Sequence, residues 1–160
     1  MGAGKTTLAK RLANKINYKF IDLDKYIEDY TGNSISHLFA NGGEINFRKI
    51  ESECLKKAIQ LSNNLVISVG GGTPCFNKNM DLINKNSTSI YLRVNEGMLF
   101  SRLQNSKSGR PLIANKSDDE LKLIIKELLA ERETFYNQSQ IIIDAKNISV
   151  EDIVKRLDLK

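Results

Sequence analysis

The opening residues Met-Gly-Ala-Gly-Lys-Thr-Thr carry the end of the phosphate-binding loop pattern G-x-x-x-x-G-K-S/T. Gly2 and Gly4 let the backbone turn so that successive N–H groups point at one anion. In such a loop, Lys5 reaches the β- and γ-phosphates and the Thr6 hydroxyl ligates Mg²⁺. The alternative is a glycine-rich tail with a chance G-K-T. A helical spacing of apolar residues directly after the loop disfavours this alternative: Leu8, Leu12 and Ile16.

Two acids, Asp22 and Asp24, end a short apolar segment. We expect both on a strand, where residues two apart project to the same side. Two close carboxylates can divide the chemistry, because one orients the water shell of Mg²⁺ while the other accepts a proton from a substrate hydroxyl. A polar strand end, with Asp24 as the cap of a following helix, explains the pair as well.

Three consecutive glycines, Gly70, Gly71 and Gly72, follow another apolar segment. They cost backbone entropy and let a ligand lie against bare backbone N–H groups. A flexible turn that ends at Pro74 is the alternative.

Three arginines have positions that suit an anionic ligand. Arg132 lies on the apolar face of a predicted long helix and needs an anionic partner, either a structural carboxylate or a ligand. Arg48 lies at the edge of a helical apolar stripe, where a salt bridge explains it equally well. Arg110 lies in a polar loop at about 105–117, which is typical of a lid over a phosphate site or of an ordinary surface loop.

These residues need elements to position them. Strand patterns occur within 18–24, 64–69, 89–94 and 140–145, and helical patterns occur within 6–16, 34–43, 45–61, 95–103, 117–136 and 149–157. Ser34, Asn95, Ser117 and a serine before the last helix are expected N-caps. Alternating strands and helices indicate an α/β fold with a parallel sheet covered on both faces. Ligands bind at the carboxyl ends of such strands, where the acids and the glycines lie.

Composition limits the classes of protein. The 160 residues fit one domain, 1–160, and no apolar run approaches the roughly 20 residues of a membrane span. The net charge of +5 comes from dispersed basic residues, so we expect no nucleic-acid partner. Cys54 and Cys75 have no metal-type spacing. We therefore expect a cytoplasmic monomer that binds small molecules.

Six segments in order, "GAGKTT", "FIDLD", "FRKIE", "VISVGGG", "GRPL" and "ERETFY", resemble the shikimate kinase family over nearly the whole chain. The resemblance implies a three-layer P-loop kinase fold of the nucleoside-monophosphate-kinase type. It also implies transfer of the γ-phosphoryl group of ATP to the 3-hydroxyl of shikimate, on the route through chorismate to aromatic amino acids. ATP and Mg²⁺ are the implied cofactors.

The resemblance also implies roles for individual residues. The expected ATP contacts are Gly2, Ala3, Gly4, Lys5, Thr6, Thr7, Arg102 and Arg110. The expected shikimate contacts are Asp24, Arg48, Gly70, Gly71, Gly72 and Arg132. Thr6 ligates Mg²⁺ and Asp22 supports it from the second shell. Lys5, Asp24 and Arg110 are the expected catalytic residues, with Asp24 as the proton acceptor.

The sequence departs from the family at its start, where the first glycine of the loop and the strand before it are absent. The resemblance places that strand in the middle of the sheet, between "LVISV" and "SIYLRV". Without it, we expect these two strands to stand about 9–10 Å apart, twice the usual spacing, or to close up. We expect low stability and low activity for the 160-residue chain on this ground.

Two other functions compete with this interpretation. A gluconate-type P-loop kinase would share the loop and the lid but would not need two carboxylate-binding arginines. A truncated, non-catalytic shikimate-binding module would follow if the shortened loop cannot hold ATP. A nucleic-acid module is the least favoured.

Overall fold

The computed structural model describes residues 2–104, 116–145 and 148–157. Arg110 and most of the expected lid loop lie outside the described residues. The four predicted strands form: β1 (Lys19–Asp22), β2 (Leu65–Ser68), β3 (Ile90–Arg93) and β4 (Ile141–Asp144). Their prediction from short β-branched segments is confirmed.

The strands form two parallel pairs, β1 with β2 and β3 with β4. The register of the first pair sets Asp22 opposite Ser68. Within the described residues, β2 and β3 exchange no ladder hydrogen bonds, and the division falls where the resemblance places a further strand. An apolar cavity of about 120 Å³, lined in part by Val69 and Leu92, lies next to this division. The predicted spacing of β2 and β3 stays a prediction.

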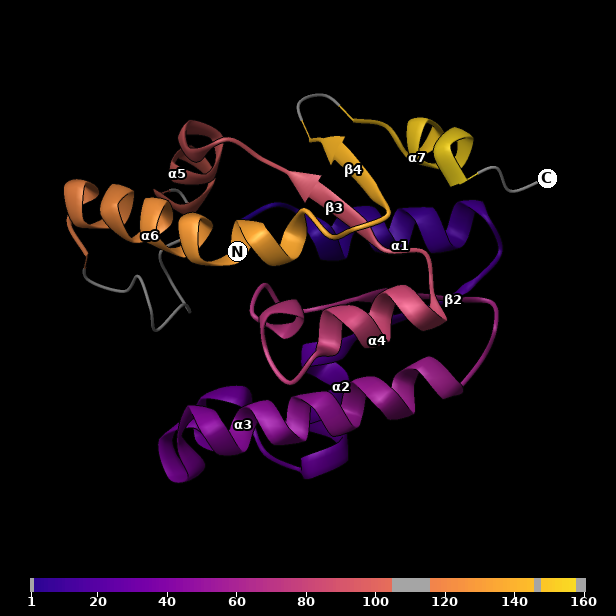
Figure 1. The fold of residues 1–160 in the computed structure, drawn as a ribbon, viewed down its shortest axis with the longest axis horizontal. Helices are drawn as coiled ribbons and strands as arrows, with labels where there is room; N and C mark the ends of the chain where they lie inside the picture. The colour runs from indigo at the N-terminus through magenta and orange to yellow at the C-terminus, as the bar shows by residue number, and fades with distance from the viewer. Residues whose placement is uncertain (1, 105–115, 146–147, 158–160) are drawn as a thin grey trace.

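Helices connect and cover the strands (Figure 1): α1 (Lys5–Lys15), α2 (Leu23–Thr31), α3 (Ile35–Gln60), α4 (Asn79–Asn86), α5 (Glu96–Gln104), α6 (Asp118–Tyr136) and α7 (Val150–Leu157). A 3₁₀ turn spans Thr73–Cys75. Figure 1 shows α2 and α3 together at one end of the molecule, below β2, and α5 and α7 at the other end, beside β3 and β4. No helix among the described residues has both the length and the apolar character that a membrane span requires.

Alternating strand residues face different helices, which confirms the expected cover on both faces. Val66 of β2 packs in a cluster with α1 and α7, around buried Leu12 and Ile153, whereas its neighbour Ile67 packs against α2 and α3. A third buried cluster joins α5 and α6 through Leu103 and related residues. The strands therefore link separate apolar layers.

The predicted caps of four helices are confirmed, because each side chain accepts a first-turn N–H: Ser34, Asn95, Ser117 and Ser149. The expected position of Asp24 is wrong. β1 ends at Asp22, whose carboxylate accepts the N–H groups of Asp24 and Lys25 and so caps α2. Asp24 consequently lies in the first helical turn rather than on the strand. α2 was expected only in the alternative that made Asp24 its cap, and the cap is Asp22 instead. No bounds were predicted for α4.

Two predicted apolar stripes need correction. In α6, the spacing of Leu121, Ile124, Leu128 and Phe135 predicts the inward stripe. Leu121 and Ile125 are the buried residues, and Tyr136 rather than Phe135 lines the apolar cavity with Arg132. In α3, the spacing of Phe47, Ile50, Cys54, Ala58 and Leu61 predicts one inward stripe. Leu61 is instead 56% exposed, because the helix ends at Gln60. A small error in helical phase accumulates over several turns, so the ends of a stripe are placed least accurately.

The predicted stop at Gly42–Gly43 appears as a break inside α3. Gly43 has φ 66° and ψ 177°, a conformation that is essentially confined to glycine. The break lets the Phe39 ring approach the Phe47 ring, with centroids 4.3 Å apart. One residue thus turns the first part of α3 back over the second.

We expect Gly43→Ala to lower the free energy of unfolding by about 1–3 kcal/mol, the usual cost of one strained backbone conformation. Nothing lies within 4 Å of a Cβ built at Gly43, so this loss would come from the backbone alone. Gly97→Ala is the matched control, because Gly97 lies inside α5 without a positive φ. Urea unfolding of both variants checks the prediction, which fails if the two variants are equally stable.

Candidate active site

An open cleft of about 590 Å³ lies at the carboxyl ends of β1 and β2. Every site residue that the sequence predicted and the structure describes lines it: Gly2, Ala3, Gly4, Lys5, Thr6, Thr7, Asp22, Asp24, Arg48, Gly70, Gly71, Gly72, Arg102 and Arg132. Arg110 lies outside the described residues. The cleft therefore collects residues from segments that are far apart in the sequence.

The phosphate loop occupies one wall of the cleft. Gly2 and Gly4 have φ 73° and 78°, and Gly4 is the N-cap of α1. Because glycine has no side chain to cap the helix, the first N–H groups of α1 face outward for another acceptor. Together with the helix dipole, they make a site for an anion. Arg102 donates to the carbonyl oxygens of Ala3 at 3.3 Å and Gly2 at 3.4 Å, which ties α5 to the loop.

Three oxygen-bearing side chains meet behind the loop. The Thr6 hydroxyl donates to Asp22 Oδ2 at 2.9 Å and lies 3.4 Å from Ser68 Oγ. Hydroxyl and carboxylate oxygens suit Mg²⁺, which usually retains waters and takes other ligands from phosphates. The described ranges contain no group of three or more His, Cys, Asp or Glu residues that could hold a metal. A magnesium ion here would thus depend on the phosphates of a bound nucleotide.

Asp24 lies against the glycine run, with its Oδ1 3.3 Å from the position of a Cβ built at Gly70. It is open to solvent as a whole, but partial burial of its carboxyl group raises its pKa, with further increases from Asp22 and Glu51. The charge of Lys5 opposes this shift. A carboxylate with a raised pKa is a stronger proton acceptor, which suits a general base.

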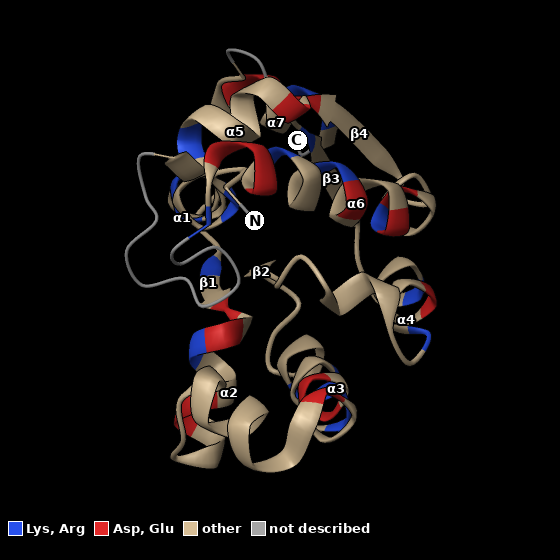
Figure 2. Ribbon diagram, turned by 90° about the vertical axis from the view of Figure 1, so that its left-hand side faces the viewer, with Lys and Arg blue, Asp and Glu red and all other residues tan. Residues whose placement is uncertain are grey.

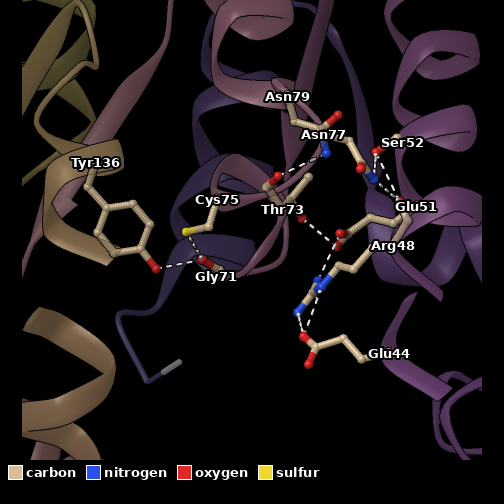
Figure 3. A network of polar contacts seen from close by, with 10 residues as sticks. All are labelled: Glu44, Arg48, Glu51, Ser52, Gly71, Thr73, Cys75, Asn77, Asn79 and Tyr136. Carbon is tan, nitrogen blue, oxygen red and sulfur yellow. Dashed lines mark hydrogen bonds and ion pairs between the residues drawn. The ribbon is translucent and has the colours of Figure 1, made fainter. Parts of the chain in front are cut away.

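Arg48 belongs to a polar network at the base of the cleft (Figure 3). Its Nη1 donates to Glu51 Oε2 at 2.8 Å, and its Nη2 donates to Glu44 Oε1 at 3.1 Å. Glu51 is only 1% exposed, and its other oxygen accepts the Thr73 hydroxyl at 2.7 Å. The guanidinium also lies 4.3 Å from the Phe76 ring centroid. The salt bridge left open by the sequence exists, and Arg48 still lines the cleft.

At the last residue of the glycine run, glycine is needed because there is no space for a side chain. An unusual backbone conformation is not the reason. Gly72 has φ −84° and ψ −22°, which any residue adopts. A Cβ there would lie 2.5 Å from Arg48 Nη2. At Gly70, a Cβ would lie 3.1 Å from Thr73 Oγ1 and 3.3 Å from Asp24 Oδ1. Side chains of the site therefore pack directly against the bare backbone.

The opposite wall comes from α6. Arg132 is partly buried and faces the cleft, where its charge lowers the pKa of the Cys75 thiol less than burial raises it. One turn later, the Tyr136 hydroxyl donates to the Gly71 carbonyl oxygen at 2.6 Å. Arg132 and the glycine run thus lie close together.

Sequence reasoning missed several residues of the site. The additional cleft residues are Ile35, Phe39, Phe47, Glu51, Ser68 and Val69. Glu51 was within reach of prediction, because it follows Arg48 by three residues on one helical face. The apolar residues give no signal, because a cleft wall and a core face have the same sequence pattern.

We expect Gly72→Ala to push Arg48 away from Glu51 and leave a buried carboxylate poorly paired. A lost partner of a buried polar group costs about 1–3 kcal/mol of the free energy of unfolding. Gly97→Ala, with only Asn95 Oδ1 at 3.6 Å from its new Cβ, should change stability far less. Equal unfolding curves for Gly72→Ala and the wild type would contradict the prediction.

Comparisons with known proteins agree with this geometry. The family model described as shikimate kinase matches residues 1–158. A shikimate kinase of Azobacteroides pseudotrichonymphae is 46% identical, covering 98% of this chain and 92% of the relative. One from Bacteroides thetaiotaomicron is 42% identical over 98% of this chain and 91% of its own length.

Two solved structures have the same fold. The crystal structure of Bacteroides thetaiotaomicron shikimate kinase superposes with a TM-score of 0.94 at 40% identity, covering 99% of this chain and 94% of that one. The Acinetobacter baumannii shikimate kinase, solved in complex with shikimate, gives a TM-score of 0.83 at 28% identity, covering 98% of this chain and 86% of that one. The phosphate loop, the paired acids and the two arginines thus lie in a P-loop kinase fold, and the chain belongs to the shikimate kinase family.

Proposed function

We propose that this cleft transfers the γ-phosphoryl group of ATP to the 3-hydroxyl of shikimate, with the residue roles set out below. One observation carries the assignment. Arg48 from α3 and Arg132 from α6 line the same cleft as a phosphate loop and the carboxyl group of Asp24. The cleft thus offers arginines to an anionic acceptor and a phosphate loop to a nucleotide.

On the nucleotide side, the roles follow from charge and geometry. The first N–H groups of α1 and Lys5 bind the phosphates, and Arg102, which donates to the loop carbonyl oxygens, is proposed as the adenine contact. Arg110, outside the described residues, is proposed as the lid arginine. Thr6 would hold Mg²⁺ directly and Asp22 would orient it through Thr6 and water. Bound there, the ion neutralises charge on the phosphates.

On the acceptor side, Asp24 accepts the proton of the attacking hydroxyl. Arg48 and Arg132 bind the substrate carboxylate, because the planar guanidinium matches two carboxylate oxygens. The ring of the acceptor lies against Gly70, Gly71 and Gly72, where a side chain would block it. Phosphoryl transfer depends mainly on such positioning and on charge neutralisation.

We also infer a cytoplasmic monomer that binds these small molecules and no nucleic acid. Figure 2 shows basic and acidic residues spread over the helices of both sides of the molecule, without one basic stripe in that view. A nucleic-acid surface needs clustered basic residues. Light scattering of the purified protein, with and without single-stranded oligonucleotide, tests the monomeric state and the absence of nucleic-acid binding.

The role of Arg132 is tested with a panel of hydroxylated acids. We expect the wild type to form ADP with shikimate and not with gluconate, and Arg132→Ala to weaken shikimate binding by about 2–5 kcal/mol, the loss of one charge-assisted pair. Calorimetry should show unchanged ATP affinity. The exposed Arg11→Ala on α1 is the control. Gluconate turnover, or unchanged shikimate affinity in Arg132→Ala, would overturn the assignment.

Asp24→Asn should lower turnover by about 10²–10⁴-fold, because an amide has the same shape but cannot accept the proton. It should not lower stability. The folded-state pKa of Asp24 is raised, so its ionisation opposes folding above that pKa and has no effect below the unfolded value.

The melting temperature of Asp24→Asn should therefore equal or exceed that of the wild type at mildly alkaline pH, with the difference shrinking as pH falls. Asp29→Asn, an exposed position on α2 paired with Lys25, is the control for turnover. If Asp24→Asn keeps more than about a tenth of wild-type turnover, Asp24 is not the general base.

A further inference from the structure

We propose that Tyr136 is a positioning residue for the acceptor carboxylate, because it fixes Arg132 and the glycine run relative to each other. The proposal rests on the role of Arg132 proposed above. Tyr136 does not line the open cleft; it lines the apolar cavity behind it. Its effect on the substrate would thus act through other residues.

A hydrogen bond joins Tyr136 to the glycine run. Tyr136 Oη donates to the Gly71 carbonyl oxygen at 2.6 Å, in a partly buried position, across 65 residues of sequence (Figure 3). Gly71 has no side chain of its own to pack, so backbone contacts must set its position. The weak Cys75 Sγ contact to the same oxygen, at 4.0 Å, is a poor substitute.

The phenol ring of Tyr136 is held in one orientation by its packing. The Tyr136 ring packs against the Tyr91 ring of β3, with centroids 4.9 Å apart and an interplanar angle of 38°. Burial raises the pKa of the phenol, which keeps it protonated as a donor, although the neighbouring Arg132 charge opposes the shift. The ring is thus anchored on a strand while its hydroxyl holds the turn.

The turn that contains the glycine run lies between Arg48 and Arg132. Thr73, directly after the glycine run, donates to Glu51, which holds Arg48. Tyr136 holds Gly71 from the other side, one helical turn after Arg132. The separation of the two guanidinium groups is therefore set through this turn. A planar carboxylate gripped by both groups needs that separation to stay constant.

The test is Tyr136→Phe, which keeps the ring on Tyr91 and removes only the donor. We expect the KM for shikimate to rise about threefold to tenfold, the factor of one hydrogen bond of typical net strength. The KM for ATP should be unchanged and kcat should stay within about twofold. Tyr91→Phe, which removes the hydroxyl of the other ring, should leave all three constants unchanged. A purely structural role would lower the melting temperature without this selective rise in KM.

An analogue with a primary alcohol in place of the carboxylate makes the test specific. Tyr136→Phe should affect shikimate and leave the weaker turnover of the analogue unchanged. An unchanged shikimate KM, or equal losses with both acceptors, would overturn the proposal. Arg132→Ala is measured in parallel: if it alone raises the shikimate KM, only the positioning role fails. If neither variant raises it, the proposed carboxylate site fails as well.

Discussion

The buried carboxylate of Glu51 is the constraint around which the acceptor side of the cleft is arranged. A charge that is 1% exposed needs partners for both of its oxygens, since an unpaired buried charge is very costly. Arg48 satisfies one oxygen and the Thr73 hydroxyl satisfies the other. Through these two bonds, the middle of α3 is joined to the turn that follows β2. If Arg48 moved away, the buried Glu51 carboxylate would lose a partner, so the fold sets the position of Arg48.

The nucleotide side is arranged by the sheet. Parallel pairing sets Asp22 opposite Ser68, and the Thr6 hydroxyl lies against both side chains. Asp22 also caps α2, so one carboxylate ends a strand, starts a helix and orients the hydroxyl expected to meet the metal. Its helix then carries Asp24 toward the glycine run. Residues 22–24 thus connect the Thr6 hydroxyl, which lies against Asp22, with the glycine run, which lies against Asp24.

Much of this arrangement was predictable, because it depends on local signals. β1 ends in an acid and the glycine run follows β2, four helices start at a serine or an asparagine, and Gly43 breaks α3 where two glycines were expected to stop a helix. What could not be predicted depends on packing between distant segments. The pairing of Glu51 with Arg48 follows from their spacing, but its burial and its bond to Thr73 depend on the turn after β2, 22 residues away in the sequence. Tyr136 differs from Phe135 by 100° around a helix, a choice that the apolar pattern alone does not decide.

The aromatic surroundings of Arg48 have a consequence for the entropy of binding. Its side chain is 11% exposed, flanked by the Phe76, Phe47 and Phe39 rings and held by Glu51 before any ligand arrives. Ordering a long side chain on binding costs about 0.5–1.5 kcal/mol, and here folding has already ordered it. If Arg48 binds a carboxylate as proposed, the group that yields is Glu44, whose side chain is 55% exposed and accepts from Nε and Nη2 of the guanidinium. An arriving carboxylate would exchange with a like-charged, solvated neighbour, leaving the arginine in the rotamer that the fold selected.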